Sequence, residues 1–240
     1  MITKKLTFFT LFILTLLVGF KSQSLAQTTE PDTSWDNWLI MGNKVVFGGQ
    51  NQYKHSHEIQ WRAENNFTAL NTLLYEAVFT YSPNERWEIV PDFRYSLKPT
   101  RRETRLGFGI VRKDYIGEGV TQIAQQVKWQ GDFKSEGDYT MAVRYVPSIS
   151  HIINDKYIVG GLVAAVYQWG PSFPPSIAFI RAGPTFGMIF DDVHTLSIVP
   201  AFGADNLGEY GWAYSFTPIV QLIIRVNKNY KYLPARYINF

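Results

Sequence analysis

The sequence lacks cysteine altogether, and beyond its first 20 residues it also lacks long apolar runs. Without cysteine no disulfide can form, although small exported domains usually depend on disulfides for their stability. Without an apolar run of about 20 residues, the rest of the chain offers no candidate for a transmembrane helix. If this part of the chain lies in a membrane, it must therefore cross as β-strands.

The first 26 residues predict a cleaved secretory signal peptide. Two lysines precede an almost wholly apolar stretch (6–20), and Ser24 and Ala26 are the small residues that a signal peptidase requires. This stretch is short for a membrane span of about 20 residues, so an uncleaved anchor is the weaker alternative. We expect the mature chain to begin at Gln27, and the lack of a cysteine argues against a lipid anchor there.

The mature chain carries no excess charge of either sign. The whole sequence has 23 basic and 20 acidic residues, and three of its lysines lie within the signal segment. Removing those three leaves 20 basic residues, which equals the 20 acidic ones. This balance gives no reason to expect nucleic acid as a partner. Residues 27–240 suffice for one domain, and no linker divides them.

The dominant pattern is an alternation of polar and apolar residues. In the segment 55–65, Glu58 and Arg62 share one parity, whereas Ile59 and Trp61 share the other. Successive side chains of a strand point to opposite faces, so this segment has one polar and one apolar face. The same period recurs in nine further segments, which are 73–82, 87–96, 104–113, 121–133, 139–145, 156–169, 177–190, 194–204 and 211–226.

These segments predict an all-β fold. Turn signals such as "SPNER" and "KSEGD" separate them, and no interval has the pattern of an amphipathic helix. Residues 37–49 add a strand at the start, and residues 229–240 add another at the end. We expect an antiparallel transmembrane β-barrel of about 12 strands, with ten as the alternative. An even number would return both termini to the same side, as in single-chain bacterial barrels.

Two architectures share this alternation, and they differ in which face meets the core. A soluble sandwich or a lipocalin-like barrel turns its apolar face inward, whereas a transmembrane barrel turns it to lipid. The predicted strands exceed the usual length of about 5 to 6 residues and match the roughly 9 to 11 that a tilted span requires. Tyrosine and tryptophan gather near the strand ends, which suits interfacial belts. We therefore expect the transmembrane barrel.

Two features argue against that choice. Arg112 is a charge on the apolar parity. Four prolines also fall inside the predicted strands, and each removes a hydrogen bond from a barrel that has no free edge. These prolines are Pro91, Pro184, Pro200 and Pro218.

Several stretches resemble known outer-membrane proteins. "SWDNWLIMGNKVVFGG", "EIQWRAENN" and "YSPNERWEIVPDFRYSLKP" show an early tryptophan, a Gln-x-Arg strand and an N-x-x-W turn. In these features the first half of the chain resembles a small Gram-negative outer-membrane β-barrel family without an assigned function. The terminal Phe240 resembles the C-terminal signal of such proteins, although Arg236 and Pro234 interrupt its alternation. The resemblance implies an outer-membrane location and recognition by the barrel-insertion machinery.

In a transmembrane barrel the charges of the polar parity face the lumen. Both signs occur there in similar numbers, which argues against strong ion selectivity. Such charges must be paired or wet, so they form either a closed network or the lining of a narrow passage. The residues concerned are Glu58, Arg62, Glu64, Glu76, Glu88, Asp92, Arg94, Arg105, Lys128, Arg144 and Arg181.

No motif predicts catalysis, a metal site or a cofactor. His55 and His57 share one strand face, but no cysteine or carboxylate cluster at ligand spacing accompanies them. A lipid hydrolase needs a serine beside a histidine, and the candidate pairs are "SISH" (150–151) and "HTLS" (194–197). Neither matches the His-x-Ser spacing of known outer-membrane lipid hydrolases, so we interpret them as turn and strand-end residues.

The sequence thus predicts a non-enzymatic outer-membrane barrel that is either structural or a narrow channel for small solutes. The alternatives are a lipid-modifying hydrolase and a soluble periplasmic binding barrel. The expected partners are outer-membrane lipid, lipopolysaccharide and the insertion machinery. The oligomeric state stays open.

Overall fold

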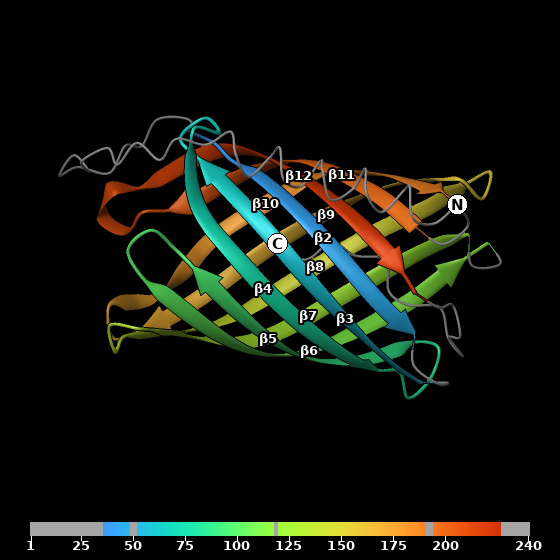
Figure 1. Ribbon diagram of the computed structural model, residues 1–240, viewed down its shortest axis with the longest axis horizontal. Helices are drawn as coiled ribbons and strands as arrows, with labels where there is room; N and C mark the ends of the chain where they lie inside the picture. The colour runs from blue at the N-terminus through green and yellow to red at the C-terminus, as the bar shows by residue number, and fades with distance from the viewer. Residues whose placement is uncertain (1–35, 49–51, 118–119, 191–193, 227–240) are drawn as a thin grey trace, which may run out of the picture.

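The computed structural model describes residues 36–48, 52–117, 120–190 and 194–226, which form a closed barrel (Figure 1). A short 3-10 helix, η1 (Gly208–Tyr210), precedes the last strand. Among the described residues no helix is long and apolar enough to cross a membrane. The strands are β1 (Asp36–Asn37), β2 (Leu39–Gly48), β3 (Tyr53–Glu64), β4 (Ala69–Tyr81), β5 (Trp87–Leu97), β6 (Arg102–Ile116), β7 (Thr121–Lys134), β8 (Tyr139–Ile153), β9 (Tyr157–Gly170), β10 (Phe173–Phe190), β11 (His194–Asn206) and β12 (Trp212–Arg225).

The barrel closes between its first and last long strands. From β2 to β12 each strand pairs antiparallel with the next, and β12 then pairs with β2 in parallel, from Ile219–Ile40 to Arg225–Val46. The closed barrel has eleven long strands, close to the predicted number of about 12. With eleven strands β2 and β12 run in the same direction, so their pairing is parallel. The further strand predicted at 229–240 lies outside the described residues.

Every predicted segment within the described residues forms a strand, and several strands extend beyond their predictions, β8 the furthest. β8 continues to Ile153, eight residues past the predicted end of its segment. The extension keeps the alternation, because Val146, Ser148 and Ser150 are buried while Ile149 is exposed. The proline at its start hid this continuation from the sequence pattern.

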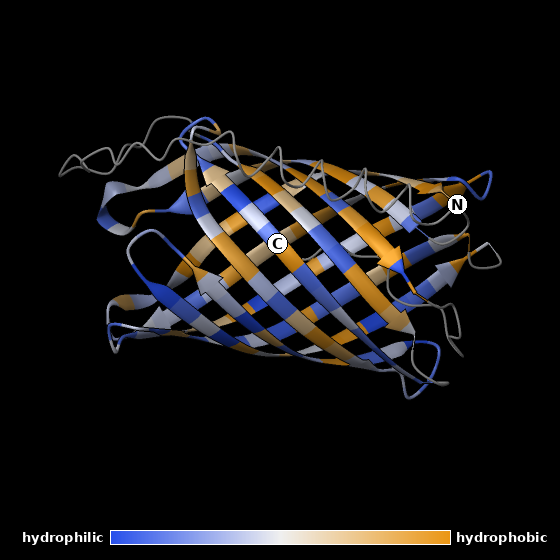
Figure 2. Cartoon of the chain, viewed as in Figure 1, coloured by the Kyte–Doolittle hydropathy of each residue, from blue (hydrophilic) through white to orange (hydrophobic). Residues whose placement is uncertain are grey.

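The apolar parity faces outward, as predicted. Phe79 and Val127 are 58% and 51% exposed. Glu76 and Lys128 lie on the other parity of the same strands, and each is 1% exposed. Figure 2 shows the resulting alternation of apolar and polar bands along the strands. A soluble barrel would bury its apolar side chains and expose its charges. The reverse arrangement is that of an outer-membrane β-barrel.

The exterior carries aromatic rings near the ends of its strands. Tyr53 and Tyr81 stack with their ring centroids 5.0 Å apart, and Trp212 is exposed at the start of β12. Such rings suit the interface between hydrocarbon and headgroups. Arg112, the exception to the charge pattern, also points outward, and its Nε lies 3.1 Å from Asp114 on the same strand.

Three of the four prolines lie at a gap in one of their ladders, whereas Pro218 is the register partner of Pro200 in the continuous β11–β12 ladder. β10 and β11 pair up to Ala182–Phe202 and again from Phe186–Ile198, and Pro184 and Pro200 lie in the gap between. The β4–β5 ladder has a similar gap at Pro91. Because proline lacks an N–H, a locally interrupted ladder is the expected response. The barrel therefore closes despite these residues.

The interior is filled differently on its two sides. Strands β3 to β8 contribute most of the buried charged side chains. The opposite wall buries uncharged polar side chains such as Ser197, Thr217 and Gln221 and also an apolar cluster. This cluster comprises Ile40, Val146, Leu162, Ala164, Val199, Ala201 and Ile219. The buried charges thus gather on one wall, and the site lies along it.

Candidate solute site in the barrel lumen

Most of the predicted luminal charges are buried. Eight of the eleven are buried, and Arg62, Glu64 and Arg105 are partly exposed. All eleven lie on the parity opposite to the exposed apolar side chains of their strands. The structure brings ten of them together in two regions, a paired network in the middle of the barrel and a cavity toward one end. Glu64 belongs to neither region, and its Oε2 accepts a hydrogen bond from Asn71 Nδ2 at 2.5 Å.

In the network, cross-strand ion pairs close the middle of the lumen. Arg94 donates through Nη2 to Glu76 Oε1 at 2.9 Å, and Lys128 donates to Asp92 Oδ1 at 2.7 Å. The side chains of both pairs are at most 4% exposed. Because so little of these four side chains is exposed, the two ion pairs pack closely in the middle of the barrel.

Further ion pairs continue the network toward the other end of the barrel. Glu88 pairs with Lys113 at 3.1 Å and with Lys54 at 3.2 Å. Glu58 lies 3.7 Å from Lys44 Nζ and accepts a hydrogen bond from Gln221 at 2.9 Å. Each buried carboxylate of this region thus has at least one cationic neighbour, as charges removed from water require.

A glycine on a neighbouring strand makes room for one of these pairs. A Cβ atom at Gly107 would lie 2.5 Å from both Asp92 Oδ2 and Lys128 Cε, which is closer than van der Waals contact allows. Gly107 is the register partner of both Asp92 and Gln130. The residue is therefore glycine because the ion pair occupies the space of a side chain.

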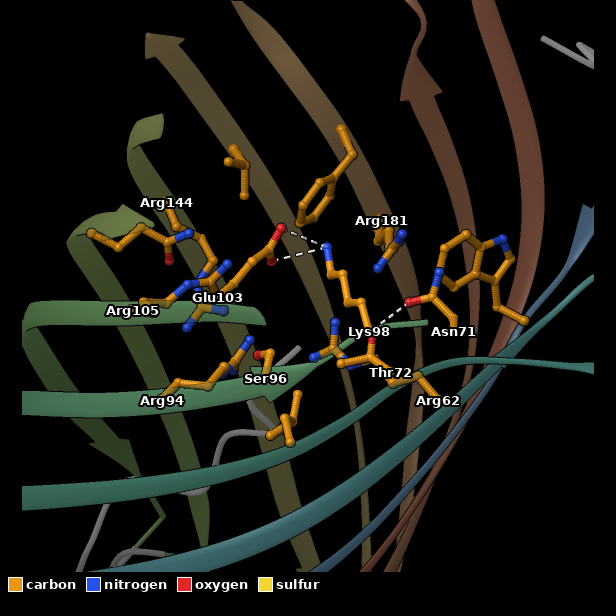
Figure 3. Close-up of a pocket in the computed structure, with 15 residues that line it drawn as sticks. Arg62, Asn71, Thr72, Arg94, Ser96, Lys98, Glu103, Arg105, Arg144 and Arg181 are labelled. Atoms are coloured by element: carbon orange, nitrogen blue, oxygen red, sulfur yellow. Dashed lines mark hydrogen bonds and ion pairs between the residues drawn. The ribbon is translucent and has the colours of Figure 1, made fainter. Parts of the chain in front are cut away.

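Toward one end the lumen widens into a cavity of about 220 Å³ (Figure 3). This end carries the β3–β4, β5–β6 and β7–β8 turns. Six lining side chains are cationic and one is acidic. The lining residues are Trp38, Arg62, Asn71, Thr72, Leu74, Arg94, Ser96, Lys98, Glu103, Arg105, Gln130, Arg144, Val166, Phe179 and Arg181.

Four of the six cations have a carboxylate partner. Beyond the Arg94–Glu76 pair, Arg105 binds Asp132 through both Nε and Nη2, at 2.5 and 3.0 Å. Arg181 donates to Asp205 at 3.2 Å, and its guanidinium also lies 4.6 Å from the centroid of the Phe179 ring. Lys98 pairs with Glu103. Arg144 donates to the amide oxygen of Gln126 at 3.5 Å.

Arg62 is a cation of the cavity whose described hydrogen bond goes to a neutral group. Its Nε donates to the neutral Gln60 Oε1 at 2.6 Å, and its buried Nη2 has no hydrogen-bond partner. Within the described part of the chain no carboxylate lies within ion-pair distance of it. A buried guanidinium nitrogen without an acceptor is costly, so this position favours a bound oxyanion.

Lys98, Glu103 and Arg101 form a cluster at the mouth, where β5 turns into β6. Lys98 Nζ lies 3.0 and 2.9 Å from the two oxygens of Glu103, and Arg101 Nε lies 2.7 Å from Oε1. Partial burial in the turn lowers the pKa of Lys98, and the hydrogen bond to Glu103 opposes that shift. In Figure 3 the Lys98 and Glu103 side chains extend toward each other.

Several members of this site were not predicted from the sequence. Glu103 and Asp132 lie on the luminal parity of β6 and β7, close to the predicted Arg105 and Lys128. Lys44 lies on the luminal parity of β2, opposite Glu58. Extending each predicted strand by two residues at the same parity would have found Glu103. Lys98 gave no such signal, because it lies in a turn.

The histidines lie on the outer face. His55 Nδ1 and His57 Nε2 are 3.1 Å apart, and the other nitrogen of His57 lies 2.7 Å from Tyr75 Oη. Phe47 stacks on His55 with centroids 4.8 Å apart. The described residues contain no group of three or more potential metal ligands among His, Cys, Asp and Glu. The histidines are thus part of an aromatic cluster on the lipid-facing wall.

The two serine–histidine pairs are divided between the faces of the barrel. Ser150 and Ser197 are buried on the luminal parity, whereas His151 and His194 lie on the outer parity. His151 Nδ1 lies 2.8 Å from Thr121 Oγ1, and His194 Nδ1 accepts a hydrogen bond from the Arg225 N–H at 3.3 Å. A strand side chain cannot reach through the wall, so neither histidine can activate its serine.

No protein-family model matches this chain, and no curated protein matches it. Among solved structures it is similar to a NanC porin, with 11% identity, a TM-score of 0.48, and coverage of 71% of this chain and 87% of that one. A KdgM porin has 15% identity and a TM-score of 0.42, with 67% of this chain and 80% of that one covered. A bacterial polysaccharide outer membrane secretin has 8% identity and a TM-score of 0.47. The likeness covers 67% of this chain and spans 60% of the secretin's length.

Proposed function

We propose that this protein is a narrow, non-enzymatic outer-membrane channel that prefers small anionic solutes. The observation that carries the proposal is the charge of the cavity, where six cationic side chains and one acidic side chain line about 220 Å³. A lumen lined mainly by one sign of charge raises the local concentration of solutes of the opposite sign. The cavity is therefore an entry site for anions.

The ion preference of the lumen depends more on where its charges lie than on their total number. The balanced count of the sequence argues against strong selectivity, but the two signs are distributed unevenly along the lumen. Arg62 lacks a carboxylate in the described residues, so the cavity keeps a net positive charge after its pairs are counted. An oxyanion bound there would supply the missing hydrogen-bond acceptor.

The buried ion pairs in the middle of the barrel limit which solutes could pass. A solute leaving the cavity meets the Arg94–Glu76 and Lys128–Asp92 pairs, whose side chains are almost wholly buried. Passage requires these side chains to change rotamer. At each ion pair, a small anion can take the place of the carboxylate on its cationic partner. We therefore propose a low conductance and a size limit set by the cavity.

A structural barrel is the second candidate, and the same buried ion pairs favour it. Paired charges and an apolar wall can fill a barrel interior without forming a route. Both candidates share the same exterior, which would contact outer-membrane lipid and lipopolysaccharide. Both also require the barrel-insertion machinery for assembly. A lipid hydrolase is disfavoured because its serines and histidines lie on opposite faces.

The decisive experiment is conductance in a planar lipid bilayer. The purified mature protein is reconstituted between two KCl solutions of different concentration, and the reversal potential is measured. The channel predicts small conductance steps and a reversal potential whose sign shows a preference for chloride over potassium. A silent membrane with correctly folded protein would favour the structural barrel, and a preference for potassium would overturn the proposal.

A further inference from the structure

We infer that Glu103 determines the selectivity of the cavity, because its carboxylate occupies the cations that an incoming anion meets first. The inference rests on the proposed function, since it concerns how anions enter the same cavity. Glu103 is the one acidic residue among the described residues that line it. It acts as a tethered anion that a solute must displace.

The geometry at the mouth carries the inference. Both oxygens of Glu103 contact Lys98, and Oε1 also accepts from Arg101 Nε at 2.7 Å. Lys98 and Arg101 belong to the β5–β6 turn, and Glu103 is the second residue of β6. The cluster therefore lies at the end of the barrel, between solvent and Arg105, which is the next residue of the same parity on β6.

The other carboxylates of this region have different positions. Glu76, Asp132 and Asp205 each bind one arginine of the cavity, but none of them lines it. These three carboxylates bind the arginine side chains without facing the cavity. Glu103 instead occupies space that a solute could use, and the cations it binds are partly exposed, at 27% for Lys98 and 33% for Arg101. An anion from solution can reach these two side chains.

Exchange follows from this arrangement. A carboxylate or phosphate group that replaces Glu103 on Lys98 and Arg101 makes the same charge-assisted hydrogen bonds that Glu103 gives up. The wild-type mouth thus admits anions that compete well with a carboxylate and rejects neutral solutes and cations. Removing the Glu103 charge should strengthen anion binding about tenfold, the order expected for one charge a few ångströms away at a partly wet site.

The test measures anion binding to the mature protein in detergent micelles by calorimetry, with inorganic phosphate and acetate as separate probes. Glu103→Gln should bind each probe about tenfold more tightly than the wild type. Lys98→Gln should bind each probe more weakly, because one cation is lost and the Glu103 charge, no longer paired with Lys98, repels the probe more strongly. The opposite signs of these two changes distinguish the inference from a general loss of structure.

The matched control is Asp138→Asn. Asp138 lies in the β7–β8 turn at the same end of the barrel and pairs with Lys134 at 2.6 Å, outside the cavity lining. Its replacement should leave affinity within twofold of the wild type. Unchanged or weaker binding by Glu103→Gln, with normal wild-type binding, would overturn the inference alone. Absence of binding by the wild type as well as the variants would overturn the proposed function and this inference together.

Discussion

Glu76 on β4 and Arg94 on β5 are direct register partners, and they form a buried ion pair in the middle of the barrel. Arg94 donates both Nε and Nη2 to the same carboxylate oxygen, at 3.2 and 2.9 Å. The pair joins neighbouring strands on the face that meets neither lipid nor bulk water. It therefore links the closure of the lumen to the stability of the fold.

Breaking this pair should destabilise the barrel strongly. Arg94→Gln leaves the Glu76 charge in a buried position, which typically costs about 3 to 5 kcal/mol. Urea unfolding in detergent micelles should show this loss, and the double variant with Glu76→Gln should recover part of it. Arg112→Gln, which breaks an exposed pair on the outer face, should cost less than about 1 kcal/mol. Equal effects of the two single variants would contradict the buried-pair account.

A cation on the outer face should block assembly. Phe79→Arg and Val127→Arg each place a charge on a side chain that is more than half exposed to lipid. The cost at the bilayer midplane is about 2 to 4 kcal/mol for each. Folding is measured as the heat-modifiable gel band of closed barrels. Gln126→Glu, adjacent to Val127 but luminal and within reach of Arg144, should fold, and the opposite pattern would show that the apolar face is a soluble core.

A methyl group at Gly107 should disturb the Lys128–Asp92 pair. The added Cβ of Gly107→Ala would lie 2.5 Å from atoms of both partners, and overpacking of this kind costs about 1 to 3 kcal/mol. Gly109→Ala is the matched control two residues away, since its Cβ would have no neighbour closer than 3.5 Å. Unfolding experiments should show a loss for the first variant and little change for the second. An unchanged stability of Gly107→Ala would mean that the ion pair can shift to make room for the added methyl group.

The signal peptide remains a prediction, because residues 1–26 lie outside the described part of the chain. If it is cleaved as expected, the mass of the exported protein corresponds to a chain that begins at Gln27. The protein should also fractionate with the outer membrane. Recovery of the processed protein in the soluble periplasmic fraction would contradict the assignment to a membrane, whatever its N-terminus.

The sequence predicted the fold well because alternation is a local property. A single strand such as β3 shows its two faces through Glu58 and Ile59, and the prediction needed no knowledge of its neighbours. The pairing of β12 with β2 was beyond it, since strand number and closure depend on the whole barrel. β8 was predicted too short because Pro147 obscured its continuation.

The site was predicted less completely, for a related reason. Arg62 and Arg94 were identified as luminal from parity, but parity does not give the height of a residue along the barrel. That height depends on strand tilt and register, which bring Arg62, Arg181 and the β5–β6 turn to one cavity. The gathering of six cations around one cavity is thus a tertiary property, and the balanced charge count concealed it.

The most direct test of the account is the ion preference of an Arg62→Glu channel. Reversing this charge places a carboxylate where the cavity has a cation without an ion pair in the described residues, while Arg112→Glu makes the same change on the outer face. In planar bilayers under a KCl gradient, the account predicts a chloride preference for the wild type and Arg112→Glu, and a reduced or inverted preference for Arg62→Glu. An unchanged reversal potential in the Arg62→Glu variant would contradict the claim that the luminal cavity selects anions.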